Sequence, residues 1–182
     1  KWKTKNIGAL TLEDRHALKR GPFGGAIKKE IFVPHGFKVY QQQNVIKNDF
    51  STGSYFINDI DYERLEPFSV KPSDILISCS GTIGKIAIVP FEAQPGIINQ
   101  ALLKITLDQN IILPMFFVAL WQCEPFAKQI LGMTHGTGMK NMKSMSEIKK
   151  INFIAPPIIK QKQFCHIVNK TLKIKKKMAH SL

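Results

Sequence analysis

The stretch DILISCSGTIGKIAIVP, Asp74–Pro90, decides the fold that we expect for this chain of 182 residues. An apolar run at Ile75–Ser78, a turn with two glycines and a second apolar run at Ile86–Val89 predict a β-hairpin. A nucleotide-binding loop also combines glycines with a lysine, but Gly81 and Gly84 are too close together for that motif, and no hydroxyl follows the lysine. The sequence therefore predicts a tight turn that presents a lysine, and it does not predict an NTPase.

Sheet and helix patterns flank the hairpin. Gly96–Leu107 is a further strand-like run, so we expect the middle of the chain to be β-sheet. Before the hairpin, Leu12–Lys19 predicts a short helix. After it, bulky apolar residues at helical spacing follow Pro114, and a closing strand at 151–157 ends in two prolines. The pattern favours an α/β fold with a twisted mixed β-sheet and packed helices.

The last stretch, Ile158–His180, contains no proline, glycine or acidic residue and predicts a long helix. Its apolar side chains recur at spacings of three and four, which is typical of a coiled-coil seam. The seam comprises Phe164, Ile167, Thr171, Ile174 and Met178. We expect residues 1–157 to form one domain and residues 158–182 to form a coiled-coil helix that packs on a partner.

Charge and cysteine content narrow the class of protein. The net charge of +13 favours an anionic partner, with nucleic acid first and an acidic membrane surface second. Residues 109–182 contain twelve lysines but only Glu124 and Glu147 as acids, so this half is the expected electrostatic footprint. The three cysteines are far apart, which predicts neither disulfides nor a metal site. With no leader and no membrane-spanning run in the sequence, we expect a cytoplasmic protein.

Four stretches in order carry a resemblance to a known family. They are VYQQQNVIKNDF (Val39–Phe50), VKPSDILISCSGTIGKIAIVP (Val70–Pro90), PGIINQALLKI (Pro95–Ile105) and INFIAPPIIKQKQF (Ile151–Phe164). Together they resemble the specificity subunit of type I restriction-modification systems. The resemblance implies a DNA target-recognition domain over 1–157, followed by a conserved-region helix over 158–182.

The same resemblance implies partners. Such a subunit recognises double-stranded DNA, has no catalytic activity or cofactor of its own, and docks an adenine-N6 methyltransferase subunit and a restriction subunit. Family members usually contain two such domains, and their two helices pack antiparallel as a spacer. This chain has one of each, which leaves open whether it is a half-length subunit or a piece of a longer one. Because its helix has an apolar seam, we expect a homodimer or a second half-subunit that pairs through the C-terminal helix.

The turn of the hairpin is the first candidate for DNA contact. Glycines allow a close approach to a phosphate backbone, and Lys85 supplies a charge beside the hydroxyls of Ser80 and Thr82. The alternative is a hairpin turn whose glycines serve geometry alone and whose lysine is solvated.

Two further stretches have suitable chemistry. Gln and Asn bond bidentately to adenine in the major groove, so an exposed strand end at Tyr40–Asn44 is the best candidate for base contact, and an ordinary polar loop is the alternative. This candidate site comprises Tyr40, Gln41, Gln42, Gln43 and Asn44. Lys28 in a glycine-rich loop is a weaker candidate, because charge on a loop is usually solvated.

A third candidate is the polar loop THGTGMKNMK, residues 134–143, where phosphate and base contacts are expected from Thr137, Lys140, Asn141 and Lys143. A solvent-exposed connection is the alternative. No catalytic motif is visible anywhere in the chain. Two alternatives to a type I recognition subunit therefore remain: a protein-interaction module that works through the C-terminal helix, and a recognition subunit of another methyltransferase-nuclease system.

Overall fold

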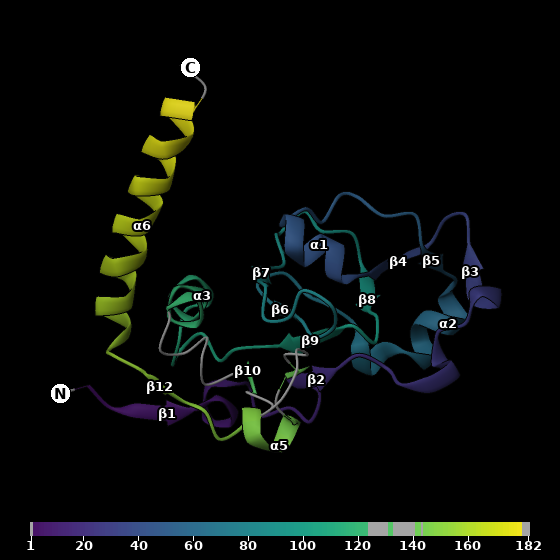
Figure 1. The fold of residues 1–182 in the computed structure, drawn as a ribbon, viewed down its shortest axis with the longest axis horizontal. Coiled ribbons are helices and arrows are strands. Elements are labelled where there is room, and N and C mark those ends of the chain that lie inside the picture. The colour runs from purple at the N-terminus through teal and green to yellow at the C-terminus, as the bar shows by residue number, and fades with distance from the viewer. Residues whose placement is uncertain (1, 124–130, 133–140, 143, 180–182) are drawn as a thin grey trace.

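A computed structural model describes residues 2–123, 131–132, 141–142 and 144–179 (Figure 1). Two four-stranded sheets and several short helices form a body from which one long helix projects. The expected α/β class is confirmed. Within the described ranges, no helix has the length and apolar character needed to cross a lipid bilayer.

The first sheet contains the predicted hairpin. Its strand order is β2 (Leu18–Arg20), β9 (Leu102–Ile105), β6 (Ile75–Ser78) and β7 (Ile86–Ile88), and all neighbours are antiparallel. Strands β6 and β7 pair with Ile75 opposite Ile88, as the apolar runs and the glycine turn predict. The hairpin prediction is therefore confirmed.

This sheet is buried on both faces, which explains why β6 is apolar at successive positions. Ile75 and Ile77 face a core that contains Phe117 and Phe153, whereas Leu76 faces a second core. Successive side chains of a strand point to opposite faces, so a strand between two cores must be apolar throughout.

The second sheet has the strand order β3 (Phe32–Val33), β5 (Phe56–Ile57), β4 (Phe37–Tyr40) and β8 (Gly96–Ile98), with β4 and β8 parallel. The expectation of one strand-like run at Gly96–Leu107 is wrong, because this run forms β8 in one sheet and β9 in the other. The chain turns between them at Asn99, whose side-chain oxygen accepts from the amide of Ala101 at 3.1 Å. A single apolar segment thus joins the two sheets.

Short helices cover the sheets, and two short antiparallel pairs complete the body. The helices are η1 (Ile7–Leu10), η2 (Gly24–Ala26), η3 (Lys29–Ile31), α1 (Gln42–Lys47), α2 (Asp59–Arg64), η4 (Glu66–Phe68), α3 (Pro114–Gln122) and α5 (Met145–Ile148). The pairs are β1 (Thr4–Asn6) with β12 (Asn152–Ile154), and β10 (Leu131–Gly132) with β11 (Asn141–Met142).

The helix predicted at Leu12–Lys19 is absent. Asp14 instead closes a tight turn, accepting from the amide of Ala17 at 3.0 Å through its main chain and from that of His16 at 2.8 Å through its side chain. The chain then enters β2, which pairs with β9. Pairing with a strand distant in sequence has overridden a weak local helix preference.

The long C-terminal helix is α6 (Ile158–Ala179), which Figure 1 shows running away from the body beyond its first turns. Its base is fixed by the fully buried Gln161, and Phe164 packs edge-on against Phe116 with 5.3 Å between ring centroids. Further along, Ile167 is 63% exposed and Ile174 is 59% exposed. The predicted helix is present, and most of its predicted seam faces solvent.

Candidate nucleic-acid interface

Segments from distant parts of the sequence meet at one end of the first sheet. The amide of Gly21, just after β2, donates to the carbonyl of Leu102 at 2.9 Å. The amide of Cys79, just after β6, donates to that of Ala101 at 2.8 Å. We call this surface the loop face, and it comprises residues 20–23, 41–43, 79–85 and 99–101.

The hairpin turn in the loop face is held from inside by Ser78. Its buried hydroxyl donates to the carbonyl of Thr82 at 2.5 Å and accepts from the amide of Lys85 at 3.0 Å. Gly81 and Gly84 have φ angles of 58° and 81°, which residues with a side chain rarely adopt. The backbone path of the turn therefore requires both glycines. Ser80, Thr82 and Lys85 are exposed on this fixed frame.

The stretch Tyr40–Asn44 is not an exposed strand end, so that expectation is wrong. Tyr40 ends the buried strand β4, and Asn44 is 1% exposed in the first turn of α1. Asn44 and Gln41 form a reciprocal capping box, with the Gln41 amide 2.9 Å from the Asn44 side-chain oxygen. The burial of Tyr40 raises its pKa to about 12. Tyr40 and Asn44 are therefore buried residues that support the site from inside the fold.

Gln43 is the exposed member of this stretch, and Gln41 and Gln42 are half-buried. A Cβ placed on Gly81 would lie 3.6 Å from the Gln42 side-chain nitrogen, so the amide of Gln42 lies against the hairpin turn. Its side-chain oxygen is buried and has no hydrogen-bond partner among the described residues. Two stretches that the sequence singles out separately are thus adjacent in space.

The glycine-rich loop after β2 runs from the loop face to the second sheet, where Ala26 and Ile27 pack beside Ile57. Lys28 is exposed, and its side chain folds back so that a Cβ on Gly25 would meet its Cε at 2.6 Å. Arg20 stands at the start of the loop, and the ring of Phe23, which is 71% exposed, lies 5.7 Å from its guanidinium carbon.

Sequence reasoning missed Arg20 and Gln100. Arg20 ends a short strand and directly follows the helix predicted at Leu12–Lys19, and Gln100 lies inside an apolar run. The polar pair Asn99–Gln100 within that run was the available signal, since it marks the turn. The candidates in the stretch 134–143 are not placed on this surface. Thr137, Lys140 and Lys143 lie outside the described residues, and Asn141 is described only as the start of β11.

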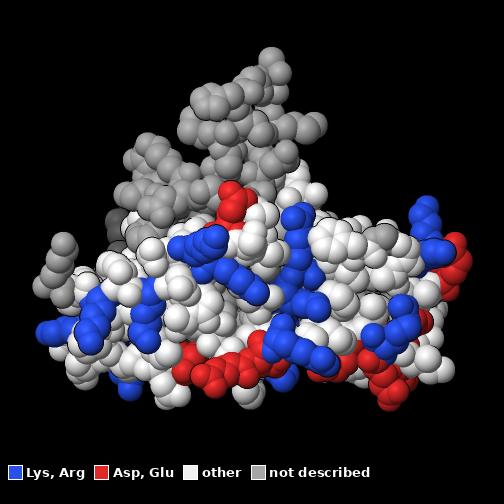
Figure 2. Space-filling view, turned by 90° about the horizontal axis from the view of Figure 1, so that it is seen from below, with Lys and Arg blue, Asp and Glu red and all other residues white. Residues whose placement is uncertain are grey.

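The face that Figure 2 shows carries side chains of both charges. Its basic side chains lie in separate groups, with acidic side chains among and below them. Two lysines are buried: Lys38 donates to the carbonyls of Phe50 and Ser51 at 2.9 and 2.8 Å, and Lys104 donates to that of Ser69 at 2.6 Å. Burial lowers the pKa of both lysines. The net charge of the chain therefore overstates the positive charge that its surface presents to a partner.

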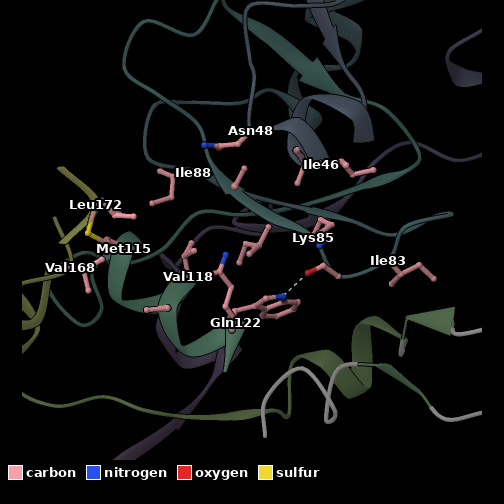
Figure 3. A pocket seen from close by; sticks show the side chains of 16 residues that line it. Ile46, Asn48, Ile83, Lys85, Ile88, Met115, Val118, Gln122, Val168 and Leu172 are labelled. Carbon is pink, nitrogen blue, oxygen red and sulfur yellow. Dashed lines mark hydrogen bonds between the residues drawn. The ribbon is translucent and has the colours of Figure 1, made fainter. Parts of the chain in front are cut away.

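An apolar groove of about 810 Å³ lies beside the loop face. Figure 3 shows its walls: Ile88 from β7, Ile46 from α1, Val118 from α3, and Leu172 from α6. Lys85 lines the groove too, so it stands at the border of the two surfaces. The Trp121 indole fixes this border by donating to the Gly84 carbonyl at 3.0 Å.

Three solved structures have a fold similar to that of this chain. The first is a structure from work on the structural basis underlying complex assembly and conformational transition of the type I R-M system. Its TM-score is 0.67 and its identity 13%, and the superposition covers 99% of this chain and 41% of that chain. For the HsdS subunit from Thermoanaerobacter tengcongensis the TM-score is 0.62 and the identity 14%, with 98% and 38% covered. For the type I S subunit from M. genitalium these values are 0.55, 18%, 97% and 39%.

These similarities concern the fold, and this chain spans about two fifths of the length of those structures. A comparison with curated protein sequences gives no match. The family model described as "Type I restriction modification DNA specificity domain" matches residues 23–180, a range that takes in nearly all of the loop face and of α6. The chain therefore belongs to the family of type I restriction modification DNA specificity domains.

Proposed function

We propose that this chain recognises a specific sequence in double-stranded DNA through the loop face. The convergence of amide, hydroxyl and basic side chains on four fixed segments carries the proposal. Gln42 lies against the turn that presents Ser80, Thr82 and Lys85. The amide of Gln42 suits a base edge, and the hydroxyls and the lysine of the turn suit phosphates. Membership of the specificity-domain family supports the same function.

The remaining parts of the proposal concern the whole assembly. Residues 1–157 are the target-recognition domain and residues 158–182 the spacer helix. The chain has no catalysis of its own and directs an adenine-N6 methyltransferase subunit, and with it a restriction subunit, to the target. Thr137, Lys140, Asn141 and Lys143 add DNA contacts from the polar stretch 134–143, and Lys28 adds one from the loop after β2.

Substitutions at Lys85 and Gln42 should have different effects on DNA binding. Lys85→Ala removes one phosphate contact, so affinity falls for every duplex and the slope of log K against log salt becomes shallower by about 0.9. Gln42→Ala removes a base contact, so preference at one base pair relaxes by about 1–3 kcal/mol. Fluorescence anisotropy over a salt series, with the preferred duplex and its single-base-pair variants, measures both effects.

Lys71→Ala is the matched control for Lys85→Ala. Lys71 is exposed just before β6, at the opposite end of the first sheet, and it bonds to Asp74 through its backbone amide and its backbone carbonyl. This control should bind as the wild type does. A uniform loss of affinity in Gln42→Ala, with no base pair relaxed, would show that the assignment of base contact to the first turn of α1 is wrong.

The exposed seam of α6 supports a second part of the proposal, a homodimer. Ile167, Ile174 and Met178 are 63%, 59% and 64% exposed, and each contributes roughly 1.5–3 kcal/mol if fully buried by a partner helix. A two-fold pair of antiparallel helices would hold two loop faces apart and match an interrupted palindrome. The helix carries seven lysines and no acid, so the seam must outweigh their repulsion.

Sedimentation tests the homodimer directly. The wild type should be a dimer at tens of micromolar, and Ile167→Asp and Ile174→Asp should be monomers, because a carboxylate in the seam would be buried without a partner. Asn169→Asp adds the same charge to the opposite side of α6 and should remain dimeric. A monomeric wild type would instead support a different partner for this helix.

That outcome would favour the second candidate function, a protein-interaction module. The observation behind it is the apolar groove, whose wall includes Val168 and Leu172 of α6 beside the exposed seam. Such a module would bind duplexes weakly and without sequence preference at any fixed salt concentration. A recognition subunit of another methyltransferase-nuclease system would retain the preference and differ in its partners alone.

A further inference from the structure

Arg20 lies where the first sheet meets the loop face. It is the last residue of β2, where it pairs with Leu103 of β9, and Leu103 pairs in turn with Ile77 of β6, two residues before Cys79. Burial raises the pKa of Cys79 to about 11, and the charge of Arg20 acts against that rise. Arg20 therefore stands in one row across the sheet with the base of the turn that carries Lys85.

The guanidinium of Arg20 is unneutralised within the described part of the chain. Its Nε is buried and has no hydrogen-bond acceptor there, and the ion pair found in that part joins Arg64 to Asp61 instead. A guanidinium has five N–H donors, and burying one without an acceptor is unfavourable unless a ligand supplies that acceptor. Arg20 thus has donor capacity that the described structure leaves unused.

Two features hold this arginine in place. The ring of Phe23 lies 5.7 Å from the guanidinium carbon, a cation–π geometry that restricts the side chain. Gly21 is pressed against the next segment, since a Cβ there would stand 1.8 Å from the carbonyl oxygen of Asn99. The strand end that carries Arg20 is therefore fixed against the turn that presents Gln100.

We infer that Arg20 is a specificity-determining residue that forms a bidentate contact with a guanine in the major groove, with Phe23 as its positioning residue. This inference rests on the proposed function. Arginine paired with the O6 and N7 of guanine is the commonest specific base contact in protein–DNA complexes. A phosphate contact needs only a mobile charge, whereas a guanidinium held on a strand end by an aromatic ring has the fixed plane that bidentate bonding requires.

The experiment measures affinity for the duplex that the wild type prefers and for all its single-base-pair variants. Arg20→Lys keeps the charge but loses the planar fork, and Arg20→Ala loses both. Both should relax the preference at one and the same G·C pair by about 5- to 150-fold and leave the other positions unchanged. Phe23→Leu should relax that same position by a smaller factor, which a merely structural role would not do.

Arg15→Ala is the control, because Arg15 is an exposed arginine before the other end of β2. It should leave every base preference unchanged. If Arg20→Lys keeps the full preference while Arg20→Ala weakens all duplexes equally, Arg20 contacts phosphate and the inference is overturned. Unchanged binding in Arg20→Ala overturns it as well. A wild type without any preferred duplex overturns the proposed function itself, and the inference with it.

Discussion

Gly21→Ala should abolish sequence-specific DNA binding. The new Cβ would stand 1.8 Å from the carbonyl oxygen, 2.4 Å from the carbonyl carbon of Asn99 and 2.9 Å from the amide nitrogen of Gln100. All three are backbone atoms, so the turn at 99–101 must move away from the loop after β2. Overpacking of this kind typically costs about 1–3 kcal/mol of stability, and more where backbone must shift.

The effect on binding should exceed the effect on stability. The shift separates Arg20 from Gln100 and disturbs the end of β4, because the Asn99 amide donates to the Tyr40 carbonyl at 3.0 Å. Loss of the base contacts that we propose for Arg20 and for Gln42, which follows β4, at about 1–3 kcal/mol each, lowers affinity for the preferred duplex by at least about 30-fold. Anisotropy titrations and thermal unfolding measure the two effects separately.

Gly8→Ala is the matched control for this substitution. Gly8 lies in η1, and a Cβ there would meet only the side-chain oxygen of Asn6 at 3.3 Å. Its affinity for the preferred duplex should equal that of the wild type. If Gly21→Ala binds that duplex as tightly as Gly8→Ala does, the loop face does not depend on this close approach, and our account of how it is held together fails.

Gln161→Leu should produce the largest loss of stability on α6. This side chain is fully buried and links the helix to two segments of the body. It accepts from the Leu113 amide at 2.9 Å and donates to the carbonyls of Ile111 and Pro156 at 2.9 and 2.8 Å. Leucine leaves these three backbone groups unpaired, at about 1–3 kcal/mol each, so the free energy of unfolding should fall by about 3 kcal/mol or more.

Denaturant unfolding measures this loss, and Gln163→Leu serves as the control because Gln163 is exposed on the same helix. An exposed substitution of this kind should change stability by about 0.5 kcal/mol at most. Hydrogen exchange at the Leu113 amide should accelerate only in Gln161→Leu. Equal stability of the two variants would show that Gln161 does not fix the base of α6.

The local sequence pattern was sufficient to predict the elements that are stabilised by residues near one another in the sequence. The hairpin of β6 and β7 follows from two apolar runs around glycines that must adopt positive φ. Ser144 and Glu147 predict the capping box at the start of α5, which the structure contains. The proline near the start of α3 and the uninterrupted pattern of α6 likewise predict their helices.

Elements defined by distant partners could not be predicted in this way. The run Gly96–Leu107 is apolar throughout, so its division between two sheets depends on which strands flank it and not on its own period. Tyr40–Asn44 looks like an exposed polar stretch, but Asn44 is drawn inside to cap α1 and to donate to the Asp49 and Thr52 carbonyls at 2.9 and 2.8 Å. Polarity alone does not reveal such internal hydrogen bonding.

The sequence predicted the types of side chain in the candidate site, but it predicted only some of the residues that form it. Gln42 and Lys85 were chosen because amides and lysines suit DNA, and they lie on adjoining segments of one surface. Arg20 and Gln100 join them because three strands of the first sheet end or begin together, which is a property of the topology. A site built from loops at a sheet end gathers residues that no short motif contains.

Selection from a pool of randomised DNA duplexes, with the purified chain as bait, shows whether the loop face recognises a DNA sequence. We expect that the wild type enriches one defined motif, that binding weakens steeply as salt rises, and that Gly21→Ala enriches no motif. Binding of the wild type to all duplexes with equal affinity, at every salt concentration, would contradict the claim that the loop face recognises a DNA sequence.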